Sequence, residues 1–136
     1  AGISTTNTWN DESIHLVDIL STVMELTGQD YPATYAGRPS KPIEGVSIVN
    51  SFSAQPLPER ETVMGFDFGM GKGVRDGKWK LVKYKNNPWE LYDLEIDRTE
   101  THDLAAKHAD RVVAMIAAFE QWEKDCAAGL PMANNQ

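Results

Sequence analysis

The chain has 136 residues, of which 41% are hydrophobic and 24% charged, and its formal net charge is −7. This length fits one domain, or one domain with a piece of another, and the hydrophobic share is sufficient for a packed core. The acidic balance argues against nucleic acid or an anionic membrane as a partner, and no apolar run approaches the ~20 residues that span a bilayer.

An amphipathic helix is predicted over residues 13–27. Its apolar residues recur at steps of three and four and form one stripe, which consists of Leu16, Ile19, Leu20, Val23 and Leu26. Asn10 or Asp11 is expected to cap the start of this helix, and Gly28 suits the position just after its end. The spacing therefore indicates a helix with one apolar face.

A long linker over residues 29–60 follows this helix. Proline and glycine interrupt the linker throughout, at Pro32, Gly37, Pro39, Pro42, Gly45, Pro56 and Pro58. One short helical turn is expected at residues 48–52. The remainder is connector that must pack against something, because long structureless loops are uncommon inside compact domains.

Four strands are predicted next, at residues 61–66, 71–75, 78–84 and 89–93. Asp76 and Gly77 are expected to form a two-residue hairpin turn, since both positions need a positive φ that Gly adopts freely and Asp tolerates. The short connections favour an antiparallel meander. Trp79 and Trp89 are expected to anchor the sheet, with one face against a helix and the other against a neighbouring surface.

A second helix is predicted over residues 110–126. Its apolar stripe consists of Val112, Ile116, Phe119, Trp122 or Glu123, and Cys126. Residues 129–131 are expected to end the helix, and residues 132–136 to be frayed. The predicted fold class is α+β: a small four-stranded antiparallel sheet packed by a C-terminal helix, preceded by one N-terminal amphipathic helix and a long Pro/Gly-rich linker.

Candidate metal ligands are sparse in this sequence. His15 and Asp18 could share a ligand at i, i+3, but a hydrogen-bonding or packing role is favoured. Residues 93–99 place oxygens at alternate positions, as a calcium loop does. An EF-hand needs Gly at the sixth position of its loop and Glu at the twelfth, and Arg98 and Leu104 stand there instead. No metal site is therefore predicted.

The single Cys126 excludes an internal disulfide. Its acidic neighbours would raise the pKa of the thiol, so it is interpreted as a core or helix-edge residue and not as a nucleophile. The first residues have neither the basic segment nor the apolar segment of a signal peptide. The missing initial Met is consistent with a chain that is processed or cut from something larger.

Residues 69–73 read Gly-Met-Gly-Lys-Gly. Their backbone amides could face an anion, with Lys72 adding positive charge. No helix start follows and the Walker spacing is missing, which argues against a nucleotide-binding loop. A flexible hairpin loop is the favoured interpretation, and an anion-facing lip is the alternative.

Several segments, taken in order, resemble the sulfatase family, and its arylsulfatase branch in particular. Residues 15–28 resemble the helix that closes the family's large α/β domain, although the family usually has Pro where this chain has Ser21. Residues 42–47 resemble the linker that follows in the family. The family's C-terminal sheet is resembled by residues 64–67 and 72–82, and the match is completed by residues 89–94, 97–100 and 104–105. The last helix fits the family as well.

The resemblance implies hydrolysis of sulfate esters by a formylglycine, made from Cys or Ser in a Cys/Ser-x-Pro/Ala-x-Arg motif, together with a calcium ion. This chain lacks that motif, because Ala-Ala-Gly follows Cys126, and it also lacks the family's paired Asp residues. Residues 1–55 would be the last helix and linker of the catalytic domain, and residues 56–136 the C-terminal subdomain that helps to wall the substrate cleft. No catalytic, cofactor-binding or metal residue is therefore assigned, and the isolated chain is expected to be inactive.

The resemblance also implies that one loop faces the cleft, through Asp67, Gly69, Gly71 and Lys72. The expected partner is the catalytic domain of the parent sulfatase, in a periplasmic or secreted location, and self-association through residues 13–28 is a further expectation. Two alternatives stay open: a freestanding binding module, and a fragment of a phosphonate or phosphate ester hydrolase of the alkaline phosphatase superfamily. The first helix and the long linker favour a piece of a larger enzyme over a freestanding module.

Overall fold

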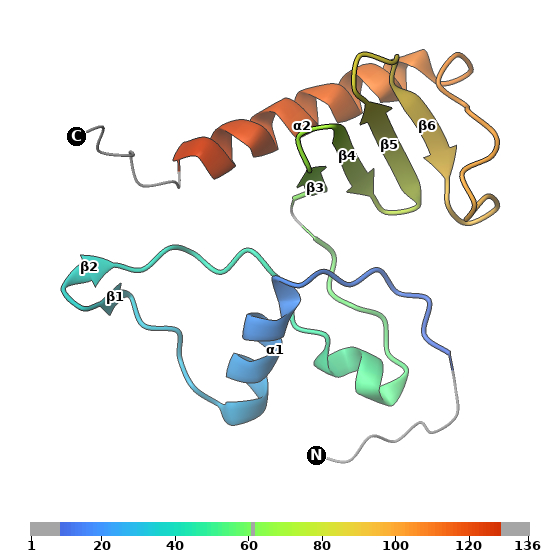
Figure 1. The fold of residues 1–136 in the computed structure, drawn as a ribbon. Helices are drawn as coiled ribbons and strands as arrows, with labels where there is room; N and C mark the ends of the chain where they lie inside the picture. Colours follow the sequence, from blue (N-terminus) through green and yellow to red (C-terminus); the bar gives the residue numbers. More distant parts are fainter. Residues whose placement is uncertain (1–8, 61, 129–136) are drawn as a thin grey trace, which may run out of the picture. The chain divides into compact units, whose positions relative to one another are not determined.

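The computed structural model describes residues 9–60 and 62–128, and the chain divides into two compact units. The first unit runs from Ala1 to Glu61 and the second from Thr62 to Gln136. Figure 1 shows the elements of both units in sequence colours. Within the described residues, the helices are too short or too polar to cross a membrane.

The first unit contains the helix α1, Asp18–Thr27. It begins at Asp18, later than residue 13, and its N-cap is Val17, so the expected caps Asn10 and Asp11 are wrong. The carboxylate of Asp18 accepts the backbone N–H of His15 at 2.6 Å. The end of the helix is as predicted. Gly28 adopts φ 63°, and the amide of the next residue donates to the carbonyl of Met24 in a Schellman motif.

The linker holds two elements. A hairpin of two short strands, β1 (Thr34–Tyr35) and β2 (Arg38–Pro39), was not predicted. Its turn residues Ala36 and Gly37 both have positive φ, at 50° and 76°, as a type I′ turn requires. The short helical turn was predicted, and the structure places it at η1, a 3₁₀ helix over Val49–Ser53.

The apolar stripe of α1 is exposed within the structure. Its five residues are between 44% (Leu20) and 77% (Leu16) accessible, whereas Asp18 and Thr22 are buried at 1% and 7%. Periodicity correctly identifies the helix and its apolar face. The side of the helix that packs within the first unit is nevertheless the polar one.

The second unit is a four-stranded antiparallel sheet in the order β3-β4-β5-β6, as predicted. The strands are β3 (Met64–Asp67), β4 (Gly71–Asp76), β5 (Trp79–Tyr84) and β6 (Glu90–Asp93). The hairpin turn lies one residue later than expected. Asp76 pairs with Trp79, so Gly77 and Lys78 form the turn, and the positive φ of 55° is at Gly77 alone.

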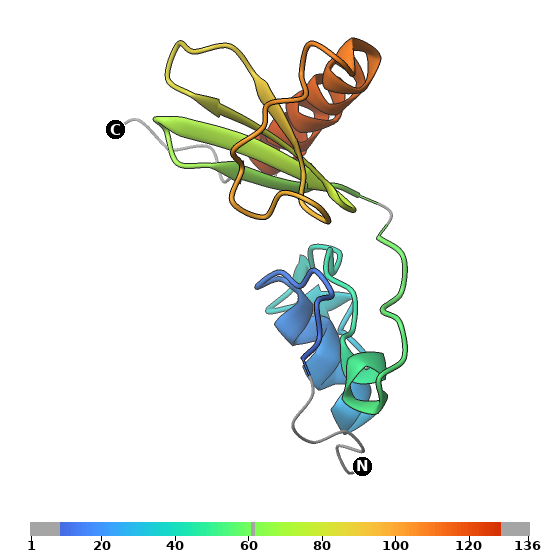
Figure 2. The same cartoon turned by 90° about the vertical axis from the view of Figure 1, so that its right-hand side faces the viewer.

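The helix α2, Ala109–Ala128, lies along one face of this sheet, as Figures 1 and 2 show. Sheet and helix share an apolar core of Val74, Leu81, Leu91, Met115 and Phe119. Met115 was not in the predicted stripe. Cys126 was interpreted as a core or helix-edge residue, and its exposure excludes the core position. The expected end of the helix at residues 129–131 and the tail at 132–136 lie outside the described residues.

Gly65 on the edge strand β3 faces Trp122 of α2. A Cβ atom at position 65 would lie 2.2 Å from the indole ring, which is closer than atoms can pack. Trp122 in turn lies 5.6 Å from Phe119, centroid to centroid. Glycine at position 65 therefore allows the helix to approach the sheet this closely.

The two tryptophans predicted as anchors pack against this core but are only partly buried. Trp89 meets Phe119 edge to face, with 5.6 Å between ring centroids. Trp79 lies beside His108 at 5.1 Å and under the guanidinium of Arg111 at 4.8 Å.

Candidate functional site

The loop between β3 and β4 carries the four residues that the sequence analysis assigned to a cleft. Asp67 ends β3, and Gly71 and Lys72 begin β4. The Asp67 carboxylate accepts the amide of Gly69 at 2.7 Å, and the Phe68 amide donates to the Gly71 carbonyl at 2.9 Å. The loop is therefore a turn that satisfies several of its own polar groups.

The ammonium of Lys72 lies between two carboxylates. It is 2.5 Å from Glu123 Oε1 on α2 and 3.5 Å from Asp67 Oδ2, and it also lies 5.4 Å from the centre of the Phe119 ring. Two negative charges around one positive charge leave this cluster with a net negative charge. The arrangement disfavours the anion-facing lip, because an anion would meet both carboxylates.

The pKa values in this cluster follow from its contacts. The hydrogen bond from the Gly69 amide, together with the charge of Lys72, holds the pKa of Asp67 below its usual value. The hydrogen bond to Glu123, with the charges of Glu123 and Asp67, raises the pKa of Lys72. Both groups are therefore ionised at neutral pH, and neither is suited to transferring protons there.

The surface next to this loop is apolar. Phe68 is 80% exposed and Met70 61%, and Tyr84 is exposed on the neighbouring strand β5. The Lys85 amide donates to the Met70 carbonyl at 2.7 Å, so the β3–β4 and β5–β6 loops are joined at this end of the sheet. Backbone contacts thus hold the two loops together.

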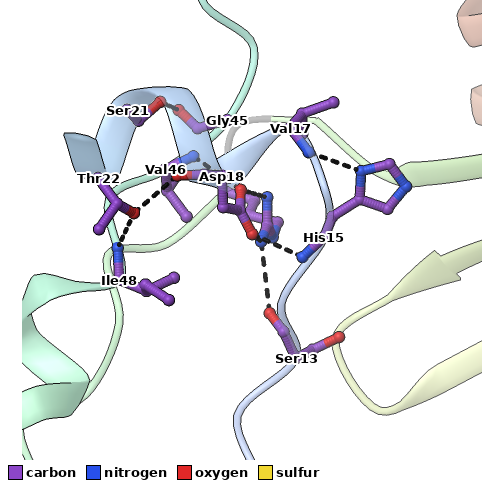
Figure 3. A network of polar contacts seen from close by, with 10 residues as sticks. Ser13, His15, Val17, Asp18, Ser21, Thr22, Gly45, Val46 and Ile48 are labelled. Carbon is purple, nitrogen blue, oxygen red and sulfur yellow. Dashed lines mark hydrogen bonds and ion pairs between the residues drawn. The ribbon is translucent and has the colours of Figure 1, made fainter. Parts of the chain in front are cut away.

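The second group of interest surrounds Asp18 in the first unit, and Figure 3 shows it. The carboxylate accepts hydrogen bonds from the backbone amides of His15 and Val46, and the two terminal guanidinium nitrogens of Arg60 donate to it. The hydrogen-bonding role that the sequence favours for this pair is thus seen for the side chain of Asp18, which accepts the backbone amide of His15. Burial alone would raise the pKa of Asp18, but the Arg60, His15 and Val46 contacts together lower it.

Two hydroxyl groups extend this network along α1. Thr22 donates to the Asp18 carbonyl at 2.7 Å and accepts the Ile48 amide at 3.1 Å, and Ser21 donates to the Gly45 carbonyl at 2.7 Å. Gly45 must be glycine here, because a Cβ atom would lie 2.2 Å from the carbonyl oxygen of Val17. The polar face of α1 is thus covered by the linker.

The segment with alternating oxygens is held by the carboxylate of Asp97. The Asp97 carboxylate accepts hydrogen bonds from the backbone amides of Thr101 and His102 at 2.9 and 2.8 Å. These bonds, and most of all the one from His102, lower the pKa of Asp97. Residues 9–60 and 62–128 bring together no group of three His, Cys, Asp or Glu side chains that could hold a metal ion. The described part of the chain thus offers no ligand set for calcium.

A groove follows the N-terminal half of α2. Its charged lining mixes acids and bases: Asp76, Asp110, Lys107, His108 and Arg111. Its apolar lining includes Val63, Met115 and Ala118. Charge alone therefore selects neither an anion nor a cation for this groove.

Two residues that organise these groups were missed by the sequence analysis. Glu123 contacts Lys72 although the two residues lie far apart in the sequence of the second unit. Arg60 contacts Asp18 although almost the whole linker separates them in sequence. No spacing rule connects residues so far apart. The sequence offered one signal for each residue: Glu123 is a charged residue at a predicted apolar stripe, and Arg60 is a charged residue at the end of the linker.

Comparisons with known proteins place this chain beside sulfatases. No protein-family model matches it. An uncharacterized sulfatase of Schizosaccharomyces pombe is 28% identical over 122 residues, which are 85% of this chain and 22% of that protein. The sequence is thus similar to a sulfatase over most of its length, while it spans about a fifth of that relative.

Solved structures share the fold. The crystal structure of Ps i-CgsB matches 77% of this chain and 23% of its own, with a TM-score of 0.62 and 21% identity. The structure of BT4656, in complex with its substrate D-glucosamine-2-N,6-O-disulfate, matches 87% of this chain and 25% of its own, with a TM-score of 0.55 and 18% identity. At these identities the likeness establishes the fold of the chain.

Proposed function

We propose that this chain is the C-terminal part of a sulfuric ester hydrolase of the arylsulfatase type. The observation that carries the proposal is the similarity to a sulfatase along 85% of the chain. The fold shared with the protein bound to a disulfated glucosamine supports it. Because the chain matches a quarter or less of these proteins, the activity would belong to the whole enzyme.

In this proposal the chain contributes no catalytic residue. Residues 1–55 belong to the catalytic domain as its last helix and linker, and residues 56–136 form the C-terminal subdomain. The parent enzyme would supply a formylglycine as nucleophile and a calcium ion that neutralises the sulfate. In this proposal the ion is held by residues of the parent enzyme outside this chain.

The loop at the end of β3 is proposed as part of the cleft wall. Added Cβ atoms at Gly69 and Gly71 would meet nothing within 4 Å, so space is open beside the backbone there. The charge of Lys72 is already compensated by Asp67 and Glu123. This loop would therefore bound the cleft and hydrogen-bond to the uncharged part of a substrate, while the sulfate is bound elsewhere.

The partner of the chain would be the remainder of the catalytic domain. The stripe on α1 is exposed on the side away from the buried Asp18 and Thr22. Burying each large apolar side chain of this kind contributes roughly 1.5–3 kcal/mol. A covering surface on the catalytic domain would make the first unit part of a larger core.

The experiment that tests the proposal compares the protein encoded by the whole reading frame with the isolated chain. A Cys/Ser-x-Pro/Ala-x-Arg motif upstream of residue 1, and calcium-dependent turnover of an aryl sulfate by the whole protein, are the expected results. The isolated 136-residue chain should show no turnover above buffer. Hydrolysis of a phosphonate monoester in place of the sulfate, or turnover by the isolated chain, would refute the assignment.

A further inference from the structure

Asp76 and Gly77 are the only Asp-Gly sequence in the chain, and they stand at the tip of the β4–β5 hairpin. Asp76 is the last residue of β4, and Gly77 opens the turn with φ 55°. Both residues are exposed to solvent. The tip thus presents a carboxyl group directly before a residue that has no side chain.

The Asp76 carboxylate differs from other aspartate carboxylates of the second unit. Four of those accept a hydrogen bond from a backbone amide, namely Asp67, Asp93, Asp97 and Asp103. Within residues 9–60 and 62–128, Asp76 has neither a hydrogen bond nor an ion pair through its side chain. No contact in that part of the chain therefore keeps this carboxyl group away from its own backbone.

The backbone N–H of Gly77 is also without an acceptor in the described part of the chain, whereas the Gly77 carbonyl accepts Arg75 Nε at 2.9 Å. An added Cβ at Gly77 would meet nothing within 4 Å, so the space beside this residue is open. Glycine also rotates more readily than other residues, because it has no Cβ atom. The Gly77 nitrogen is therefore accessible to a group that approaches from Asp76.

We propose that Asp76 is a site of spontaneous isomerisation to isoaspartate. The Gly77 nitrogen attacks Cγ of the protonated Asp76 carboxyl group and closes a five-membered ring. The N–Cγ bond forms, the bond from Cγ to the hydroxyl oxygen breaks, and the hydroxyl leaves with the amide proton as water. The product of this first step is a cyclic imide.

Water then opens the imide at one of its two carbonyl carbons. Addition at Cγ breaks the new N–Cγ bond and restores aspartate. Addition at the backbone carbonyl carbon of Asp76 breaks its bond to the Gly77 nitrogen, so the chain now runs through Cβ and Cγ and the former backbone carbonyl becomes the free carboxylate. One water is released and one is taken up, and no other reactant is consumed.

The isomer carries one additional methylene group in its backbone between β4 and the turn. Asp76 pairs with Trp79 across the hairpin, and strand pairing depends on a regular rise per residue. The extra methylene breaks this last pair of the ladder. Because Trp79 also packs against the apolar core, the thermal midpoint of the isomer should be lower than that of the original chain.

The test is prolonged incubation of the folded 136-residue chain at neutral pH and physiological temperature. Labelling by a protein isoaspartyl methyltransferase measures the isomer, and fragmentation mass spectrometry locates it. The label should accumulate at position 76 and not at Asp97 or Asp103, whose carboxylates are held by backbone amides. Thermal unfolding of the separated isomer should show the lower midpoint.

Asp76→Glu is the informative variant. It keeps the negative charge, but its longer side chain would have to close a six-membered ring, so the label at position 76 should be lost. The matched control is Asp110→Glu, which changes an exposed aspartate on α2 that is followed by Arg111 and should leave the label at position 76 unchanged.

Three outcomes would overturn the proposal. Label spread evenly over the aspartates would mean that the hairpin tip has no special reactivity. Label that appears only after the chain is denatured would mean that the folded hairpin protects Asp76. An isomer with an unchanged thermal midpoint would refute the effect on the ladder.

Discussion

The two units of this chain bury opposite kinds of side chain. The second unit has an apolar core in which Val74, Leu81 and Leu91 are 0% exposed. Among residues 9–60 of the first unit the buried side chains are Asp18 and Thr22, and the apolar stripe of α1 is exposed. The second unit thus resembles a small independent domain, whereas polar contacts hold the first unit together in place of a core.

This difference matters because polar contacts and apolar burial respond to different perturbations. Apolar burial is non-directional and depends on the volume and area of the side chains. A buried ion pair depends on the presence and ionisation of both partners. Variants and pH changes can therefore break one unit while the other stays folded.

The largest effect is expected from Phe119→Ala in the second unit. Phe119 is buried and its ring contacts those of Trp89 and Trp122, so its loss leaves a cavity in the core. The free energy of unfolding of the second unit should fall by about 3–5 kcal/mol. Denaturant titration followed by amide signals of β4 and β5 measures it.

The control for that variant is Val113→Ala on the exposed side of α2, which should be nearly neutral. If Phe119→Ala also removed protection at Val46 and Ile48, the two units would unfold together and the contrast between them would fail.

Acid should open the first unit. The folded pKa of Asp18 is below its ordinary value of 3.8, so its contacts contribute stability above that pH. This contribution is lost as pH falls from there through the folded pKa. Protection of the Val46 and Ile48 amides should therefore fall in acid.

The pH dependence of the first unit should disappear in Asp18→Asn, because an amide does not titrate in this range. An Asp18→Asn profile that fell with pH as steeply as the original would assign the acid transition to other carboxyl groups.

A smaller effect is expected from Trp79→Ala. Trp79 packs on the core but is partly exposed, and it contacts Arg111 and His108 at the surface. Its replacement should cost about 1–3 kcal/mol, less than a fully buried aromatic residue would. Thermal unfolding measures the cost, and an unchanged midpoint would show that Trp79 does not anchor the sheet.

The smallest effect is expected in self-association of the isolated chain. The exposed stripe on α1 favours weak pairing between chains, since contiguous apolar surface is unfavourable in water. Sedimentation over a concentration series should show an average mass that rises with concentration, and Leu20→Asp should reduce the rise. A strict monomer at all concentrations would show that the stripe does not drive association.

Local pattern predicted most of the second unit. Alternating residues, short connections and a turn glycine gave the four strands, their order and the packing helix. The turn itself was misplaced by one residue, because Asp76 can occupy either a turn or a strand end. Of the two positions considered for Cys126, core or helix edge, the core position is excluded, because Cys126 is exposed although it continues the helical stripe.

The first unit was less predictable because its determinants are not local. The helix could be identified, but the side that packs depends on Arg60, which approaches Asp18 from the far end of the linker. The pairing of Lys72 with Glu123 is hidden in the same way. Periodicity describes one element at a time, and these contacts join elements that are distant in sequence.

The close approach of Trp122 to Gly65 couples two positions during evolution. Any side chain at position 65 would collide with the indole ring, so a change there can be accepted only if residue 122 becomes smaller as well. The reverse does not hold, because a smaller residue at 122 leaves glycine permissible. Substitutions should therefore enter at position 122 first, and the order in which the two sites diverge would record the spacing between helix and sheet.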